Sequence, residues 1–172
     1  MNVREIQFEA DIEASLLTHG GWTKAPGTYN RELGLDLDKL LAFLEDTQPK
    51  EMQRYKTVYG ENYEQQLLKR LNDEIKVNGM VHVFRNGITD RGMKLKLAFF
   101  KPETSLNPGD MELYQKNIFH IARQFKYSLK NENSIDMVLL VNGLPLVALE
   151  LKNQFTGQNV DNAKRQFMML SL

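Results

Sequence analysis

Residues 134–153, with the sequence SIDMVLLVNGLPLVALELKN, decide the fold of this chain. Two apolar runs, residues 137–141 and 144–149, flank the dipeptide Asn142-Gly143. An Asn-Gly pair between apolar runs is the strongest short-range signal of a β-hairpin. Because both runs are almost wholly apolar, the pattern predicts two central, buried strands.

Three charged residues fall at the open end of this predicted hairpin. Asp136 begins the first strand, and Glu150 and Lys152 end the second. A connection of two, three or four residues sets Asp136 opposite Leu149, Glu150 or Leu151, respectively. In the three-residue case Asp136 and Glu150 face each other on one side of the sheet, and Lys152 shares that side because side chains alternate.

This group of charges predicts a metal site with a lysine beside it. Two carboxylates in one place repel unless a cation lies between them, and hard oxygen ligands suit Mg²⁺, which keeps several waters and also binds substrate phosphate. A neighbouring ammonium group can orient or help deprotonate the attacking water and stabilise charge on a phosphate oxygen. The pattern therefore predicts hydrolysis of a phosphodiester. The alternative is that the three charges only mark strand ends where the chain reaches water.

The chain resembles the nuclease core of the restriction (R) subunit of type I restriction-modification enzymes, within the PD-(D/E)xK nuclease class. The stretch from residue 133 to residue 153 carries the resemblance most clearly. Further landmarks of that family occur in the same order along the chain: residues 8–13 with Gly21-Trp22, Phe43-Leu44, residues 47–49, 85–87, 99–102 and 106–108, Tyr114 with Asn117, and Arg123-Gln124 with Tyr127-Ser128. This many landmarks in one order make the resemblance specific.

The resemblance implies roles for the charged residues of the hairpin. Asp136 and Glu150 would be metal ligands, with the Leu151 carbonyl as a third. Lys152 would be the catalytic lysine. The implied cofactor is Mg²⁺ or Mn²⁺.

The resemblance also implies contributions from two helices. Gln166 matches the glutamine of the family's Gln-x-x-x-Tyr pattern, but Leu170 stands where the tyrosine would be, so the hydroxyl is absent. Glu9 on the opening helix is a further candidate catalytic carboxylate. The alternative is that Glu9 and Glu13 belong to the solvated face of that helix.

The implied function is a DNA endonuclease domain covering residues 1–172, which cuts double-stranded DNA after translocation by a complete complex. In the family an ATP-driven motor follows the nuclease, and no Gly-x-x-x-x-Gly-Lys phosphate loop occurs here. ATP would serve only that motor, the implied partners are modification and specificity subunits, and the isolated chain should cut DNA poorly. The alternative is a noncatalytic docking module that binds DNA or partner subunits. Intact Asp136, Glu150 and Lys152 disfavour this alternative.

Charge is balanced over the whole chain but unevenly distributed. The 22 basic and 22 acidic side chains cancel, whereas residues 76–172 carry 13 basic and 8 acidic side chains. No acidic residue lies between positions 113 and 131, where Lys116, Arg123, Lys126 and Lys130 occur. These four could line a phosphate track beside the hairpin. The alternative is an ordinary solvated helix face.

Cysteine usage and hydropathy predict a cytoplasmic protein that has no membrane partner. The sequence holds no cysteine, so nothing calls for an oxidising compartment. Its N-terminus is mixed polar, and no apolar run approaches the roughly 20 residues that a membrane span requires.

Periodicity and turn residues place the remaining elements. Helices are predicted over residues 5–19, over a short segment from Asp36 or Asp38 through Leu44, over 50–77, over 110–130 and from 160 to the end, and strands over 81–84 and 94–100. Helices before, between and after strands of one sheet give an α/β fold. Together with the resemblance, this predicts a restriction-endonuclease-like core with a mixed central β-sheet flanked by helices.

Overall fold

The computed structural model describes residues 3–27, 29–104, 107–130 and 132–151. The helices are α1 (Val3–His19), α2 (Leu37–Thr47), α3 (Pro49–Tyr59), a 3₁₀ turn (Gly60–Asn62), α4 (Tyr63–Asn78), α5 (Met80–Asn86) and α6 (Pro108–Gln115). The strands are β1 (Thr23–Lys24), β2 (Ile88–Asp90), β3 (Met93–Leu95), β4 (Phe119–Lys126), β5 (Ser134–Val141) and β6 (Leu144–Leu149). No helix in these ranges is both long and apolar enough to cross a membrane.

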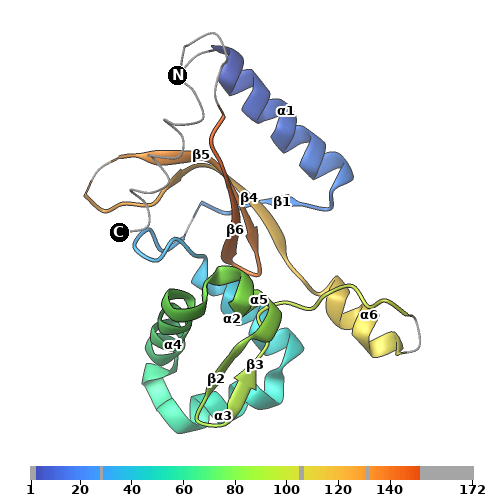
Figure 1. Cartoon of the computed structure of the whole chain (residues 1–172), viewed down its shortest axis with the longest axis vertical. Helices are drawn as coiled ribbons and strands as arrows, with labels where there is room; N and C mark the ends of the chain where they lie inside the picture. Colours follow the sequence, from blue (N-terminus) through green and yellow to red (C-terminus); the bar gives the residue numbers. More distant parts are fainter. Residues whose placement is uncertain (1–2, 28, 105–106, 131, 152–172) are drawn as a thin grey trace.

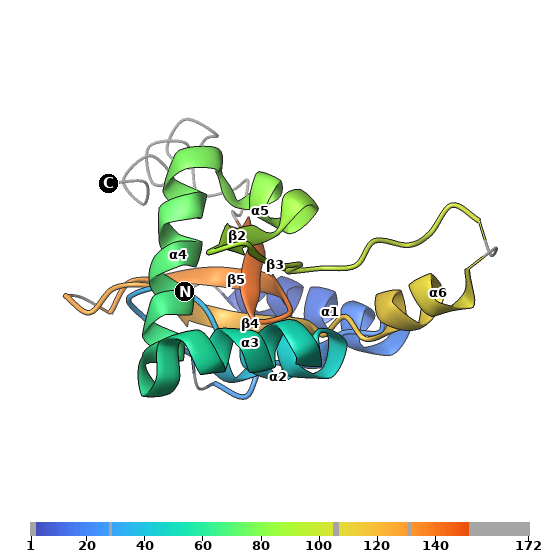
Figure 2. The same cartoon turned by 90° about the horizontal axis from the view of Figure 1, so that it is seen from below.

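The main sheet is mixed. Its strand order is β1-β4-β5-β6, with β1 parallel to β4 and the other neighbours antiparallel. A separate antiparallel pair, β2 and β3, lies among α2 to α5 below the hairpin turn (Figure 1), whereas α1 lies on the other side of the sheet from these helices. In both views α6 projects to one side of the molecule (Figures 1 and 2). The predicted α/β class with a mixed sheet and flanking helices is confirmed, and this architecture is consistent with a restriction-endonuclease-like fold.

The predicted hairpin is present, but its two strands differ in burial. β5 lies between β4 and β6 and is mostly buried, as predicted for a central strand. β6 is an edge strand of the sheet that the structure describes, and Leu146 and Val147 are 46% and 39% exposed. The prediction of two central strands is therefore wrong for β6. Pro145 fits this place, because a proline in a sheet is tolerated at an edge.

The Asn142-Gly143 turn holds the hairpin against the rest of the molecule. Asn142 and Gly143 have φ values of 53° and 81°, which suit a two-residue hairpin turn. The buried Asn142 side chain accepts from the Ile118 N–H at 2.7 Å and donates to the Leu97 carbonyl at 2.9 Å. Asp36 N–H donates to the Gly143 carbonyl at 2.8 Å, and a Cβ at Gly143 would lie 2.1 Å from the Asp36 carbonyl oxygen. The turn thus also joins the hairpin to the N-terminus of α2.

Two apolar clusters form the core. The larger one joins α2 to α5, β2 and β3 with Val141 and Leu144 at the hairpin turn, and a smaller one lies around Phe125 and Val138 in the sheet. No described side chain of α1 belongs to either cluster, and Ile6 and Phe8 on that helix are 43% and 56% exposed. Ile121 and Met137 of the sheet are also buried, at 2% and 0% exposure, outside these two clusters.

The prediction of one helix over residues 110–130 is wrong. The chain forms α6 and then β4, although Ile118 and Phe125 occur at helical spacing from Tyr114. Asn117 ends the helix, because its amide nitrogen donates to the Tyr114 carbonyl at 2.7 Å and to the Phe99 carbonyl at 2.6 Å. Residues after it pair with β1 on one side and β5 on the other, so tertiary hydrogen bonding overrides the helical pattern.

Two further elements differ from prediction in the segment 80–100. Residues 81–84 belong to α5 and not to a strand, since a short apolar run fits either structure. The predicted strand over 94–100 is limited to Met93–Leu95. Beyond it the Gln48 side chain replaces a neighbouring strand, because Gln48 Oε1 accepts from the Lys96 N–H at 2.7 Å and Nε2 donates to the Lys96 carbonyl at 2.8 Å.

The N-terminal helices agree better with prediction. The opening helix is α1, and Asp36 caps α2 by accepting from the Lys39 N–H at 3.1 Å. The single helix predicted over 50–77 is divided into α3 and α4 by a 3₁₀ turn that begins at Gly60, whose φ is 57°. The helix predicted from residue 160 lies outside the described residues.

Candidate active site

A β-bulge in β6 sets the register of the hairpin. Next to the two-residue turn, Val141 pairs with Leu144, whereas further along Leu139 pairs with Val147. Leu146 is the additional residue on β6 between these two registers. A bulge of this kind shifts every later pair by one residue, and bulges are common near active sites.

The shifted register bears on the two predicted carboxylates at the open end of the hairpin. Met137 pairs with Leu149, so the same register continued by one residue sets Asp136 opposite Glu150. Without the bulge, the two-residue turn would have set Asp136 opposite Leu149. Side chains directly across a sheet point to the same face. Both carboxyl groups are half-buried.

Asp136 is fixed by the backbone of the neighbouring segment. Its Oδ2 accepts a hydrogen bond of 2.7 Å from the N–H of Leu151. Among the described residues no group donates to its Oδ1, which is therefore available to another ligand. The Leu151 carbonyl, predicted as a further ligand, belongs to the same half-buried residue.

The donor set fits a hard divalent cation. Asp136, Glu150 and the Leu151 carbonyl offer only oxygen ligands, and Mg²⁺ is usually bound through one or two carboxylates while it keeps several waters. Across the described ranges no group of three or more His, Cys, Asp or Glu side chains could hold a metal ion. A metal at this end of the hairpin would take its remaining ligands from water and substrate phosphate.

The Glu9 side chain is buried against β4 and does not lie on the solvated face of α1. Its side chain is 3% exposed, and its Oε2 accepts from Arg123 Nε at 2.9 Å and from Nη2 at 2.7 Å. Its Oε1 accepts from Gln124 Nε2 at 2.6 Å. Hydrogen bonding to Glu9 raises the pKa of the Arg123 guanidinium above its usual value. The carboxylate is thus compensated by a fixed cation and an amide, as burial of a charge requires.

Three of the four cations predicted to contact DNA are held by carboxylates. Lys116 Nζ lies 3.2 Å from Asp46 Oδ1, and Lys126 Nζ contacts the Glu132 carboxylate. Arg123 binds Glu9, as described above. Lys130 is exposed. These residues lie at the C-cap of α6, on β4 and in the loop after β4, so the alternative of one solvated helix face is wrong. A role in DNA binding stays a prediction for all four.

Two predicted catalytic residues lie outside the described residues. They are Lys152, which directly follows Leu151, and Gln166. Sequence reasoning assigned no site role to Gln124, whose side chain contacts Glu9. The only sequence signal for Gln124 was its place in the Arg123-Gln124 landmark.

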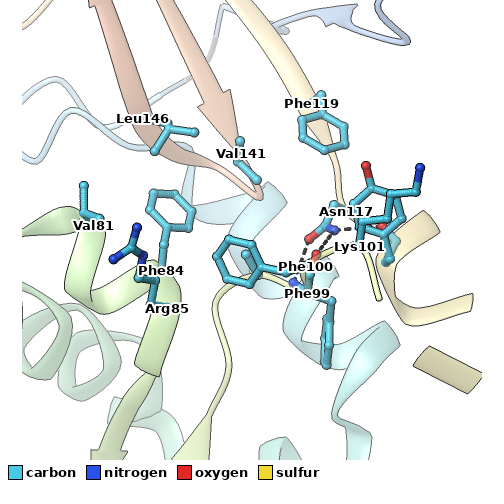
Figure 3. Close-up of a pocket in the computed structure, with 12 residues that line it drawn as sticks. Val81, Phe84, Arg85, Phe99, Phe100, Lys101, Asn117, Phe119, Val141 and Leu146 are labelled. Atoms are coloured by element: carbon cyan, nitrogen blue, oxygen red, sulfur yellow. Dashed lines mark hydrogen bonds between the residues drawn. The ribbon is translucent and has the colours of Figure 1, made fainter. Parts of the chain in front are cut away.

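The turn end of the hairpin carries a different feature, an apolar cavity of about 450 Å³. Val141 and Leu146 of the hairpin face the ring of Phe84, and Arg85 and Lys101 lie on opposite sides of the cavity (Figure 3). Its lining includes no carboxylate. The cavity therefore offers no metal ligands, and the candidate active site remains the open end of the hairpin.

Comparison with known proteins identifies the family of the chain. The family model described as type I restriction enzyme R protein N terminus matches residues 9–169. A relative from Methanocaldococcus jannaschii, which carries the name of the type I restriction enzyme MjaVIIIP endonuclease subunit, is 26% identical over 160 residues. That match covers 91% of this chain but only 15% of the relative. No solved structure matches the chain. The chain belongs to the family of type I restriction enzyme R protein N termini.

Proposed function

We propose that this chain is the metal-dependent DNA endonuclease domain of a type I restriction enzyme R subunit. The observation that carries the proposal is the β5–β6 register after the bulge at Leu146, which, continued by one residue beyond Leu149, sets Asp136 opposite Glu150. Membership of the R protein family and the endonuclease name of the relative support it. The reaction would be hydrolysis of phosphodiester bonds in foreign DNA after translocation by the complete complex.

Asp136 and Glu150 would hold Mg²⁺ or Mn²⁺ together with the Leu151 carbonyl. When bound, such a cation stabilises charge on the phosphate and lowers the pKa of a coordinated water. The hydrogen bond from the Leu151 N–H keeps Asp136 Oδ2 in place, so its other oxygen has a defined direction. A fixed carboxylate requires little reorganisation during the reaction, which favours catalysis.

Lys152 would act at the same end of the hairpin, because it follows Leu151 directly. Its ammonium group would orient the attacking water and stabilise negative charge on a phosphate oxygen. In the reaction the water oxygen bonds to phosphorus, one ester P–O bond breaks, and the departing oxygen takes up a proton. Gln166 is a further candidate for contact with this site.

The remaining functions belong to the whole protein. The chain spans 15% of the length of the relative named above, so the larger polypeptide offers room for an ATP-driven motor. We propose residues 1–172 as one nuclease domain of such a polypeptide, acting on double-stranded DNA with modification and specificity subunits in the cytoplasm. Lys130 is the most accessible of the four predicted phosphate contacts.

A noncatalytic docking module is the second candidate. The cavity at the hairpin turn favours it, because Val81, Phe100 and Leu146 at the cavity are 57%, 60% and 46% exposed. Exposed apolar groups gathered at one place commonly mark an interaction surface. A docking role would not require the carboxylates at the opposite end of the hairpin.

Nicking of supercoiled plasmid DNA by the complete restriction complex distinguishes the two functions. The nuclease proposal predicts cleavage that requires Mg²⁺ and that falls at least about 100-fold in Glu150→Gln, while DNA binding persists. Glu103→Gln, in an exposed loop, is the matched control and should cut normally. Unchanged cleavage by Glu150→Gln, or cleavage that persists without divalent cations, would refute the nuclease assignment.

A further inference from the structure

Gln124 has an unusual backbone conformation within β4. Its φ is 48°, in the left-handed region that glycine adopts readily and that other residues enter at a cost in free energy. A strained residue of this kind persists only where surrounding contacts hold it, and such residues cluster at functional sites. Gln124 therefore points to a role beyond strand formation.

The position of Gln124 relates it directly to the candidate active site. Its two neighbours on β4 are paired with β5, Arg123 with Met137 and Phe125 with Ile135. This register sets Gln124 opposite Asp136. Across the sheet, Gln124 on β4, Asp136 on β5 and Glu150 after β6 therefore follow one another.

The Gln124 side chain links α1 to the first residue of β5. Its Nε2 donates to Glu9 Oε1 at 2.6 Å, and its Oε1 accepts from Ser134 Oγ at 2.9 Å. Ser134 lies two residues before Asp136. Both ends of the amide are engaged, so the orientation of the side chain is defined by its partners.

Arg123 completes the link from the other side of Glu9. It contacts two carboxylates of α1: Nε and Nη2 lie 2.9 and 2.7 Å from Glu9 Oε2, and Nη1 lies 3.4 Å from Glu13 Oε2. Lys24 Nζ lies 3.2 Å from the same Glu13 oxygen. Through these charged side chains, Glu9 and Glu13 connect α1 to β4 and β1.

We propose that Arg123 and Gln124 are positioning residues of the nuclease site. They join Glu9 and Ser134 in one hydrogen-bonded unit, here called the clamp, which fixes the start of β5 and thereby the direction of Asp136. This inference rests on the proposed function. It also assigns Arg123 to the clamp in place of a phosphate contact, since its guanidinium nitrogens already bind Glu9 and Glu13.

Two substitutions distinguish the effect of losing the Gln124 side-chain contacts from the effect of its strained backbone. Gln124→Asn retains an amide and tolerates the left-handed conformation, but it is one methylene shorter and cannot span Glu9 and Ser134. Gln124→Gly removes the side chain and relieves the strain at this φ, at the entropic cost that glycine adds to folding. Arg123→Lys retains the charge but loses the two-pronged contact with Glu9. Gln53→Asn, on the exposed face of α3, is the matched control.

The test uses the complete restriction complex and three readouts: the DNA cleavage rate, Mn²⁺ affinity by calorimetry, and the melting temperature. Both Gln124 variants should cut about 10- to 100-fold more slowly, because a small misplacement of a catalytic group has effects of this size. They should also bind Mn²⁺ more weakly, while ATP hydrolysis stays normal. Gln124→Gly should melt modestly lower than the natural protein, because the lost hydrogen bond to the buried Glu9 carboxylate outweighs the backbone strain that is relieved. Arg123→Lys should give an intermediate loss.

Three outcomes would overturn the inference. One is normal cleavage and Mn²⁺ affinity in both Gln124 variants. Another is a cleavage loss that disappears when the assay is run well below the melting temperature, because that result would make the clamp a contribution to stability alone. The third is a cleavage loss with unchanged Mn²⁺ affinity. Failure of the proposed function is recognised separately, because Asp136→Asn would then cut at the natural rate.

Discussion

The carboxylate of Asp136 accepts a hydrogen bond of 2.7 Å from the backbone N–H of Leu151, 15 residues further along the chain. This contact closes the open end of the hairpin, where Asp136 and Glu150 are located. It also holds the backbone that leads directly into Lys152. The site is therefore built on a paired strand end, and such a support holds functional groups more accurately than a free loop.

Deletion of Leu146 should remove DNA cleavage. Leu146 is the additional residue of the β6 bulge, and its loss would continue the two-residue-turn register, in which Asp136 faces Leu149. Cleavage by the complete enzyme should then fall to the level of an active-site variant. Leu146→Ala keeps the bulge and is the control, with near-normal cleavage expected. Normal cutting by the deletion variant, with a normal circular dichroism spectrum, would show that the register does not matter.

Mg²⁺ or Mn²⁺ should raise the melting temperature of the protein modestly, because ligand binding to the folded state alone stabilises that state. The double variant Asp136→Asn, Glu150→Gln should lose this response, since it removes both charges at the open end of the hairpin. Differential scanning calorimetry with and without the cation measures the effect. An equal response in the double variant would place the ion elsewhere.

Arg123→Ala should destabilise the fold by about 3 kcal/mol, the lower end of the range for breaking a buried ion pair. The reason is that Glu9, with a side chain 3% exposed, would lose two of its three N–H donors. Urea unfolding measures the loss. Adding Glu9→Gln should recover part of it, because the uncompensated charge is removed. Lys56→Ala, which breaks an exposed pair with Glu45, should have no measurable effect.

The free energy of unfolding should decrease as the pH is lowered, because His120 takes up a proton on unfolding. This side chain is 5% exposed, and burial, followed by the nearby Lys39 cation, lowers its pKa below the usual value of 6.5. The unfolded chain therefore binds the proton first, so stability is present above about pH 6.5 and is lost as the pH falls toward the folded pKa. The urea midpoint should decrease between about pH 7 and pH 5. His120→Leu should show a shallower decrease; an identical slope would exclude this histidine as a source.

The hairpin could be predicted from the sequence because its signals are local. The Asn-Gly turn, the apolar runs around it and the capping residue Asp36 each act on neighbouring residues. The exact register could not be predicted, because the apolar run of β6 gives no alternation that marks Leu146 as the additional residue. The same apolar composition also hides the position of β6 at the edge of the described sheet.

Long-range contacts account for most of what the sequence did not reveal. Ile118, Ile121 and Phe125 have helical spacing, yet residues 119–126 form β4 because two other strands pair with it. Glu9 and Gln124 are 115 residues apart, and nothing near either one indicates that they meet. The buried contacts of Asn142 are similar, since the sequence marks this residue only as part of a turn.

The most direct test of the central claim is the ratio of DNA cleavage to ATP hydrolysis in the complete enzyme carrying Asp136→Asn. We expect cleavage to be lost while ATP hydrolysis and translocation continue, because only the chemistry at the hairpin is removed. Asp110→Asn, on the exposed surface of α6, should leave both activities unchanged. Cleavage by Asp136→Asn at the natural rate would contradict the assignment of the open end of the hairpin as the catalytic site.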